Sequence, residues 1–277
     1  MIVFAVLAGV FGSLIGSFLN VVVFRVPAGR SIVAPPSACP SCGSRIRAVD
    51  NIPVLSWLVL RGRCRDCGAA ISIRYPAVEL GTALGFAAVA LWRLPALVDA
   101  VASGSGTRIA AAMLELVAYL YLMAVSVALA LIDLDTHRLP DKIVLPAYAV
   151  GGGLLILVGI LEGDGWSVLR ALIGGAAAFL LYLLLGLTKQ GAMGFGDIKL
   201  AGLLGLYLGW AGWSSLAIGV FGGFVIGGLV SVALLVARRV KRDGGIPFGP
   251  SMLAGAWLGL VAGPAIWTAY LRLVGLA

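Results

Sequence analysis

Charged residues are scarce in this chain: of its 277 residues only 12% are charged, whereas 61% are hydrophobic. The mean hydropathy of +1.07 reflects the same imbalance. Soluble globular domains carry about 25% charged residues. The composition therefore excludes a soluble globular protein and indicates a protein embedded in a membrane.

Long apolar runs occupy most of the chain. A helix needs about 20 mainly apolar residues to cross a bilayer, and about eight such runs are present. They lie near residues 1–24, 76–97, 109–132, 143–161, 167–187, 198–210, 212–237 and 249–271. The sixth run is short and begins at a glycine-rich motif, so we expect it to be tilted, broken or partly re-entrant. The predicted fold class is an all-α polytopic membrane protein with about eight transmembrane helices.

Basic residues are nearly absent from one set of alternating loops. No basic residue precedes the first run and no small-residue cleavage site follows it, which predicts an uncleaved anchor instead of a signal peptide. Positive charge stays in the cytoplasm, so Arg25 predicts an N-terminus outside and the next segment inside. This topology keeps a stop-transfer cluster at 238–242 inside with most other basic residues. Of the 20 Lys and Arg residues, it places outside only Arg93, Arg108, Arg170 and Arg272.

The net charge of +8 then follows from membrane topology. It requires no nucleic-acid partner. The Arg-rich cytoplasmic face suits anionic lipid headgroups or an acidic partner, although a plain solvated face explains it equally. We expect a multi-pass membrane protein with its Arg-rich segment facing the cytoplasm. The sequence does not indicate an oligomeric state.

Cysteine is also rare, and all four cysteines fall in the one sizeable polar region, residues 28–75. They form two C-x-x-C pairs separated by 21 residues: Cys39, Cys42, Cys64 and Cys67. This spacing is typical of a zinc ribbon, in which each tight turn supplies two tetrahedral ligands. A reducing cytosol argues against disulfides. Four thiolates leave no open coordination position, so we predict a structural zinc and not a catalytic one.

Two of the 12 acidic residues stand at the ends of apolar runs. Asp133 follows the run at 117–132, and Asp197 ends the motif Gly194-Phe195-Gly196-Asp197. An ionisable side chain at the edge of lipid is costly and marks a functional site by default. Two adjacent carboxylates cannot both ionise cheaply, so one keeps a proton while the other activates a water, as in aspartic proteases. The charge pattern places both on the cytoplasmic side.

Other interpretations were weighed for these acids. The loop at 133–141 also holds Asp135, Asp141 and the only histidine, His137. An ordinary loop is favoured over a metal site because the histidine is single and a proline turn separates the groups. Asp141, after Pro140, is placed to cap a helix.

Two further functional classes make different demands on the sequence. An ion-coupled transporter needs ionisable groups near mid-membrane in corresponding halves, and the sequence has neither a repeat nor such a pair. A zinc-ribbon scaffold for a secretion machine needs no aspartate pair, so it predicts that changing either aspartate to asparagine is harmless.

Several motifs together resemble the bacterial type IV prepilin peptidases, which are bifunctional leader peptidases and N-methyltransferases of the GxGD aspartyl protease class. The resemblance runs nearly end to end. It rests on GSFLNVVVFRVP at 16–27, CPSC, DNIPVLSWLVLRGRC at 50–64, CRDC, RYPAVEL at 74–80, LIDLDTHRLPD at 131–141, GFGDIKLAGLLG at 194–205 and IPFGP at 246–250.

The resemblance implies cleavage of the basic leader of prepilins and pseudopilins on the cytoplasmic face, with Asp133 and Asp197 as the catalytic pair. It also implies methylation of the new N-terminal amine from S-adenosylmethionine, an activity linked to the cysteine segment. No dinucleotide-type glycine fingerprint is present, so the methyl-donor site stays unassigned. A peptidase alone, with a structural zinc segment, is the alternative. We expect three parts: a first transmembrane helix at 1–27, the zinc segment at 28–75 and the peptidase core at 76–277.

Overall fold

The computed structural model describes residues 1–188, 193–237 and 246–276. The predicted basic cluster at 238–242 lies outside these residues, as do Lys189 and the glycines at 191, 244 and 245. Within the described ranges the chain is helical, and extended pairing is limited to two isolated β-bridges. Seven of the described helices are long and apolar enough to cross a membrane. The prediction of an all-α polytopic membrane protein is confirmed.

The chain forms two compact units. The first contains residues 1–99 and 119–128, and the second contains residues 100–118 and 129–277. Helix α4, Gly106–Thr136, contributes to both.

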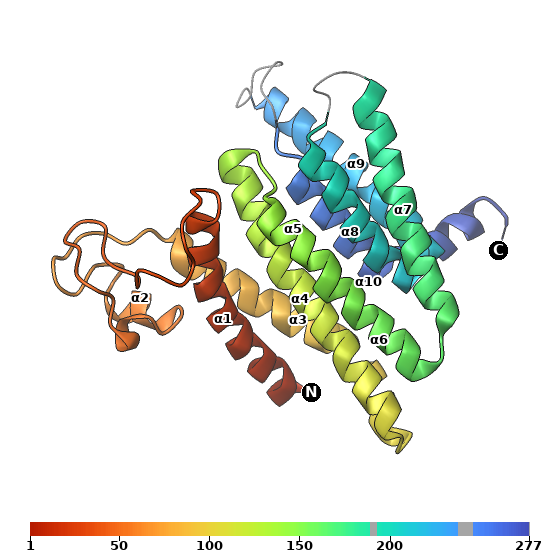
Figure 1. Cartoon of the computed structure of the whole chain (residues 1–277), viewed down its shortest axis with the longest axis horizontal. Helices are drawn as coiled ribbons and strands as arrows, with labels where there is room; N and C mark the ends of the chain where they lie inside the picture. The colour runs from red at the N-terminus through yellow and green to blue at the C-terminus, as the bar shows by residue number, and fades with distance from the viewer. Residues whose placement is uncertain (189–192, 238–245, 277) are drawn as a thin grey trace. The chain divides into compact units, whose positions relative to one another are not determined.

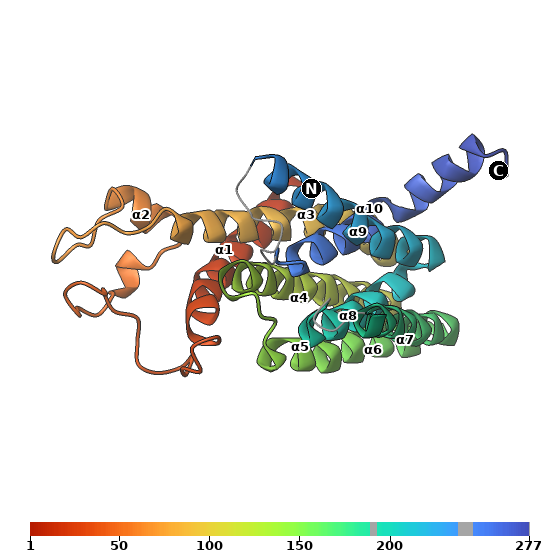
Figure 2. The same ribbon diagram turned by 90° about the horizontal axis from the view of Figure 1, so that it is seen from above.

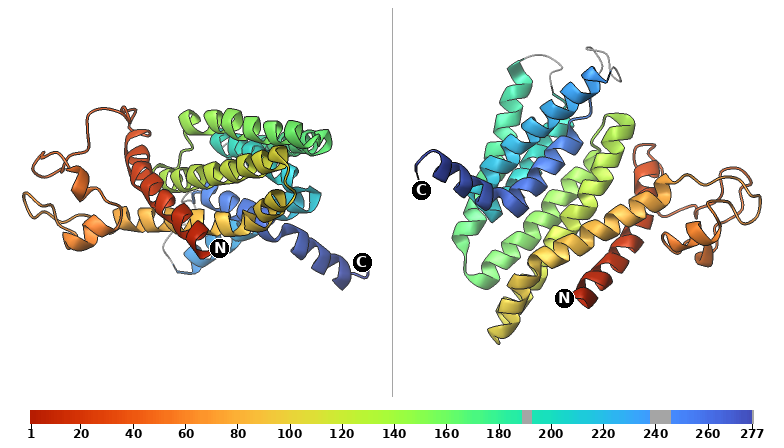
Figure 3. Two further views of the ribbon diagram at one scale, coloured as in Figure 1. Left: turned by 90° about the horizontal axis from the view of Figure 1, so that it is seen from below. Right: turned by 180° about the vertical axis from the view of Figure 1, so that it is seen from behind.

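The first unit is built on two long helices, α1 (Ile2–Arg25) and α3 (Arg74–Ala102), which lie side by side in Figure 3. Their contact uses glycines of α1, which allow two helices to approach closely. A side chain at Gly12 would place its Cβ 2.7 Å from Phe86, and one at Gly16 would lie 2.8 Å from the Glu79 backbone. The segment that joins the two helices in sequence contains η1 (Ala48–Asp50) and α2 (Leu55–Val59).

The second unit is a bundle of transmembrane helices. Its first span combines α5 (Asp141–Ala147), the π-turn η2 (Tyr148–Gly152) and α6 (Gly153–Glu162). The other helices of the bundle are α7 (Gly165–Thr188), α8 (Phe195–Ala211), α9 (Trp213–Val236) and α10 (Gly249–Leu273). Figure 1 shows α7 to α10 side by side, and Figure 2 shows α5 and α6 alongside α7 and α8.

Helix α8 is the short sixth run of the sequence, and it forms the centre of this bundle. It has 17 residues, and almost every position from Ile198 to Trp210 is buried. A Cβ at Gly205 would lie 2.5 Å from the Gly174 carbonyl oxygen of α7, so the two backbones are in contact. At its C-terminal end the Arg170 guanidinium donates to the carbonyl oxygens of Gly209 and Trp210. A cation there offsets the unpaired carbonyls of the helix end.

Candidate active site and metal centre

The last turn of α4 carries Asp133, whose side chain is buried with 4% of the residue exposed. The helix ends at Thr136 because His137 adopts the left-handed conformation, at φ 53°, and donates its N–H to the Asp133 carbonyl oxygen over 2.8 Å. The His137 side chain is exposed, as expected for a loop residue. The helix therefore ends at Thr136, one turn after Asp133, which leaves this carboxylate near a helix end.

The start of α10 supplies the partner of Asp133. The backbone N–H of Gly249, the first residue of α10, donates to Asp133 Oδ2 over 2.9 Å. A carboxylate at a helix N-terminus is favoured by the unpaired N–H groups there. A Cβ at position 249 would lie 2.7 Å from Oδ2, so only glycine allows this approach. The segment at 246–250 thus both starts a helix and contacts the site.

Asp197 lies in the first turn of α8 and is half-buried. The turn begins at Gly194, whose carbonyl oxygen accepts the Asp197 N–H over 3.0 Å. Gly196 is closely covered, since a Cβ there would lie 2.9 Å from the Leu139 Cβ. The glycines beside Asp197 therefore allow the loop after α4 to approach α8.

Leu139 lies beside the segments that hold both aspartates. It is 9% exposed, and its Cδ2 lies 3.4 Å from the position that a Cβ of Gly249 would occupy. Gly249 binds Asp133, and Gly196 precedes Asp197. The structure brings the two acids that the sequence singled out into one neighbourhood of the second unit.

A lysine two residues after Asp197 ties α8 to the start of α5. Lys199 Nζ lies 2.7 Å from both carboxylate oxygens of Asp141 and 4.7 Å from the centre of the Phe195 ring. The prediction that Asp141 caps α5 is wrong, because Pro140 is the N-cap residue and no side chain makes the capping bond. Lys199 engages the Asp141 carboxylate instead. Helical spacing alone does not reveal such a contact between helices.

The four cysteines form a separate centre in the first unit. Their sulfur atoms all lie within 4.8 Å of one another, and the Cys39 and Cys67 sulfurs are 3.8 Å apart. This clustering fits one metal ion with tetrahedral thiolate ligands. The sequence prediction that these four residues share a metal site agrees with this geometry.

Each cysteine pair lies in a hairpin of the same construction. The bridge Ala38 with Arg45 closes one hairpin, and Arg63 with Ala70 closes the other. In each, the glycine one residue after the second cysteine has a positive φ, 73° at Gly43 and 70° at Gly68. Its N–H donates over 2.9 Å to the carbonyl oxygen of the first cysteine. Because glycine adopts positive φ without strain, the chain reverses there and both sulfurs point into one turn.

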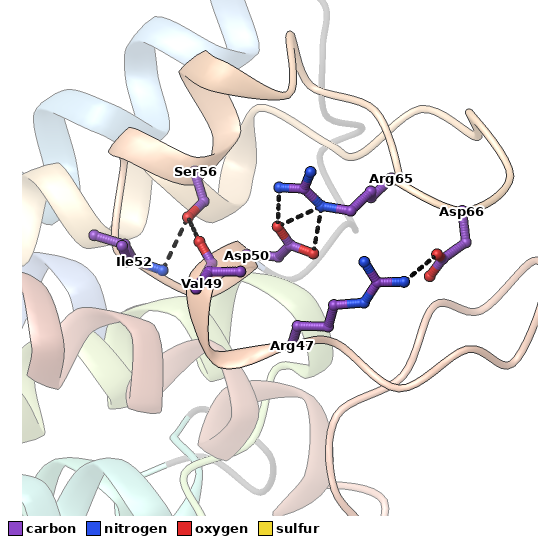
Figure 4. Close-up of polar contacts among 7 residues, drawn as sticks. All are labelled: Arg47, Val49, Asp50, Ile52, Ser56, Arg65 and Asp66. Carbon is purple, nitrogen blue, oxygen red and sulfur yellow. Dashed lines mark hydrogen bonds and ion pairs between the residues drawn. The ribbon is translucent and has the colours of Figure 1, made fainter.

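Two ion pairs join the second hairpin to the segment that follows the first, as Figure 4 shows. Arg65, between the second pair of cysteines, donates to both oxygens of Asp50, with Nη2 2.6 Å from Oδ1. Arg47, which follows the first hairpin, lies 2.8 Å from Asp66 of the second. The cysteine segment is therefore held by contacts that do not depend on the metal alone.

The thiols of the cluster differ in acidity. The backbone N–H groups of Cys42 and Ser41 lower the pKa of Cys39 to about 6. The backbone N–H of Ala69 also lowers the pKa of Cys67, but the neighbouring cysteine side chains and burial outweigh it and raise that pKa to about 12. Four adjacent thiolates repel one another, so the donor set suits a divalent cation.

Glu79 anchors the cysteine segment to helix α3. It is buried, and its Oε2 accepts the backbone N–H of Val54 over 2.7 Å. Val54 has φ 61°, a strained value for a β-branched residue. The carboxylate holds that turn in place, a tertiary contact that the residue pattern does not reveal.

Comparisons with known proteins agree with this arrangement. Residues 10–93 match the bacterial peptidase A24 N-terminal domain, and residues 120–232 match the type IV leader peptidase family. A prepilin leader peptidase/N-methyltransferase of Pseudomonas putida is 37% identical over 98% of this chain and 95% of its own length. Proteins of the same name from Aeromonas hydrophila and Neisseria gonorrhoeae are 38% and 34% identical over 94% and 95% of this chain, and 91% and 92% of their own lengths. No solved structure matches the chain.

Proposed function

Since this chain belongs to the type IV leader peptidase family, we propose that it cuts the leader from prepilins and pseudopilins with Asp133 and Asp197. It is an aspartic peptidase with methyltransferase activity. The observation that carries the proposal is the convergence of α4, α8 and the start of α10 on two carboxylates at helix ends.

The two carboxylates divide the work of hydrolysis. One, ionised, takes a proton from a water that attacks the scissile carbonyl carbon, and the other, protonated, donates to the carbonyl oxygen. The tetrahedral intermediate then breaks its C–N bond as the leaving amine gains a proton. The Gly249 N–H holds Asp133 Oδ2, so Oδ1 is the oxygen placed to meet the water or the substrate.

The substrate has to be extended where it is cut, because a peptide bond inside a helix is shielded by its hydrogen bonds. Gly194 is exposed, and the lack of a side chain there leaves its backbone open to such a chain beside Asp197. The start of an apolar helix, just after a basic leader, is a suitable place for unwinding at the membrane surface. The leader's basic charge remains in the cytoplasm, as the positive-inside rule requires.

The protein is a multi-pass inner-membrane protein. We place its N-terminus outside, and both the cysteine segment and the aspartates at the cytoplasmic face, in contact with anionic lipid. The distribution of Lys and Arg supports this orientation. Asp133, Asp197 and Gly249 all lie at helix ends that this topology assigns to the cytoplasm.

Zinc is the metal we assign to Cys39, Cys42, Cys64 and Cys67, because four thiolates in a closed tetrahedral set are typical of structural zinc. Its role there is to hold the segment folded. We assign methyl transfer from S-adenosylmethionine to this cysteine segment and its surroundings, without naming donor-binding residues. The alternative is that the segment serves the peptidase only as a structural module.

The deciding experiment measures leader removal from a synthetic prepilin by purified protein in lipid. Asp133→Asn and Asp197→Asn are each expected to lower the rate by at least about a hundredfold, because asparagine keeps the shape but cannot transfer the proton. A thermal unfolding curve controls for folding. Wild-type rates in either variant would overturn the assignment and favour a membrane scaffold.

A further inference from the structure

The short helix α2 carries its apolar residues outward. Leu55, Leu58 and Val59 are spaced as neighbours on one helix face, and each is between 57% and 77% exposed. Ser56 points inward instead: it is buried, and its hydroxyl donates to the Val49 carbonyl oxygen over 2.8 Å, as Figure 4 shows. A helix on a water-soluble surface has the opposite arrangement. The outward face of α2, which consists of Leu55, Leu58 and Val59, therefore needs an apolar partner.

Contacts between α1 and α3 show where α2 lies along the membrane-spanning helices. Asn20 donates to the Tyr75 carbonyl oxygen over 3.2 Å, and a Cβ at Gly16 would lie 2.8 Å from the Glu79 Cα. The two helices are thus antiparallel, and the first turns of α3 lie beside α1 before α1 ends at Arg25. Gly16 precedes Arg25 by nine residues, which is a length of about 13 Å at a rise of about 1.5 Å per residue.

Glu79 in turn fixes the start of α2. Its Oε2 accepts the N–H of Val54, the residue directly before α2, over 2.7 Å. A glutamate side chain and one hydrogen bond are together shorter than the length of α1 between Gly16 and Arg25. The start of α2 therefore lies beside α1 and not beyond its end.

The end of α1 marks the boundary of the membrane. This helix has 24 residues, so its length is about 36 Å, against about 30 Å for the hydrocarbon core of a bilayer. An arginine at such a helix end extends its guanidinium to the headgroups. Because α2 starts on the membrane side of Arg25, it lies where acyl chains meet headgroups. Amphipathic helices bind at this level with their apolar face in the bilayer.

Two arginines directly follow the outward face of α2. Arg61 and Arg63 are exposed, and neither forms an ion pair with a residue in the described ranges of the chain. The acids of the cysteine segment do not neutralise them, because Asp50 and Asp66 already pair with other arginines. Free positive charge beside an apolar face is complementary to a bilayer with anionic headgroups.

We propose that the outward face of α2 inserts into the bilayer at the cytoplasmic surface, with Arg61 and Arg63 on the anionic headgroups beside it. The partner is the bilayer and not another protein, because α2 starts beside a membrane-spanning helix, where lipid is the surrounding medium. The cysteine centre is then held at the membrane surface. This inference deepens the proposed placement of the cysteine segment at the cytoplasmic face, and it rests on that placement for the charge of the headgroups.

The first test introduces the photoreactive residue benzoylphenylalanine at position 58 of the full-length protein, in nanodiscs of phosphatidylcholine and phosphatidylglycerol. The same residue at position 84 is the reference for lipid contact, since Leu84 is an exposed residue of α3. Position 45 is the second reference, since Arg45 is exposed in the first cysteine hairpin. We expect lipid adducts at position 58 within about twofold of those at 84 and at least about fivefold above those at 45.

Three results of this test would overturn the inference. One is an adduct at position 58 with an added prepilin or with another part of the chain in place of lipid. Another is the absence of any adduct at position 58. The third is an equal yield of lipid adducts at positions 58 and 45, which would remove the distinction of the α2 face.

The second test measures trypsin cleavage after Arg61 and Arg63 in sealed vesicles of known orientation. Leu58→Gln/Val59→Gln weakens the contact with the bilayer, so we expect cleavage about threefold to tenfold faster than in the wild type, with unchanged metal content. Val33→Gln is the matched control, because Val33 is an exposed apolar residue outside α2, and its cleavage rate should equal that of the wild type.

Metal content and vesicle orientation keep the outcomes of the second test apart. An unchanged cleavage rate in the double variant would overturn the inference. Faster cleavage with loss of metal would also overturn it, because the two side chains would then hold the segment folded. Cleavage only from the periplasmic side would overturn the proposed orientation, and with it the anionic headgroups, even where position 58 forms lipid adducts.

Discussion

The cysteine centre and the aspartate site are built in opposite ways. Each cysteine pair is positioned by one short hairpin, closed by its own β-bridge and by a glycine at positive φ. The two aspartates come from α4 and α8, and Asp133 depends on an N–H from the start of α10. The first centre is specified mainly by local geometry and ion pairs, and the second by the packing of helices distant in sequence. Substitutions should therefore disturb the two centres by different routes.

Removing two metal ligands is expected to give the largest difference between the cysteine centre and the aspartate site. In Cys39→Ser/Cys42→Ser, two of the four sulfurs are lost, so we expect the purified protein to carry no stoichiometric metal and to lose methylation. Leader cleavage should persist, because the cysteines and the two aspartates belong to different compact units. Elemental analysis and the mass of the peptide product measure these effects in one preparation.

A different result of the same experiment would change the comparison. If cleavage disappears together with the metal while the helices remain folded, the cysteine centre is part of the peptidase. If methylation survives without the metal, the segment is structural or a docking module and the methyl-transfer site lies elsewhere. A chelator added to the wild type should reproduce the substitution, which controls for effects of the serines.

Gly249→Ala should disturb only the aspartate site. The added Cβ would lie 2.7 Å from Asp133 Oδ2, so the carboxylate or the start of α10 has to shift. A displacement of about 1 Å in a catalytic group can cost about a hundredfold in rate, and we expect cleavage to fall about tenfold to a hundredfold while metal content stays the same. Gly228→Ala in α9 is the matched control, since a Cβ there meets nothing within 4 Å. Equal rates in the two variants would contradict the assigned role of Gly249.

Much of this organisation could be predicted from the residues. The C-x-x-C spacing predicts the metal cluster because each short hairpin brings its own two thiols together. A tetrahedral metal ion then needs both pairs. The cost of a charge at the edge of lipid singles out Asp133 and Asp197 without any knowledge of the packing. For the short run at 198–210 the sequence predicts a tilted, broken or partly re-entrant segment, and α8 is one unbroken helix over Phe195–Ala211. Its tilt and its depth in the membrane stay predictions.

Contacts between helices could not be predicted in the same way. The bond from Gly249 to Asp133 and the pair of Lys199 with Asp141 depend on which helix ends meet, and no periodicity within one helix carries that information.

Breaking the ion pair of Lys199 and Asp141 should have a moderate effect on cleavage. Asp141 is half exposed, and an ion pair near water contributes little to stability. We expect Lys199→Met and Asp141→Asn each to lower kcat/KM for cleavage about twofold to fivefold by loosening the start of α5 against α8. The double variant should be no slower than either single one, since both remove the same contact. Lys142→Met, one residue along and exposed, is the control. Additive losses in the double variant would show that the two residues act separately.

The smallest effect is expected from weakening the contact between Arg65 of the second hairpin and Asp50. The guanidinium makes a forked contact with both carboxylate oxygens, at 2.6 to 3.0 Å, and lysine cannot reproduce that geometry. Arg65→Lys should therefore lose its metal to a competing chelator about twofold to threefold faster than wild type, without any change in cleavage. Arg45→Lys, in the same segment and also exposed, separates loss of the fork from a general exchange of arginine for lysine. If both variants release metal at the wild-type rate, the thiolates alone hold the centre together, and the contrast with the packed aspartate site becomes sharper.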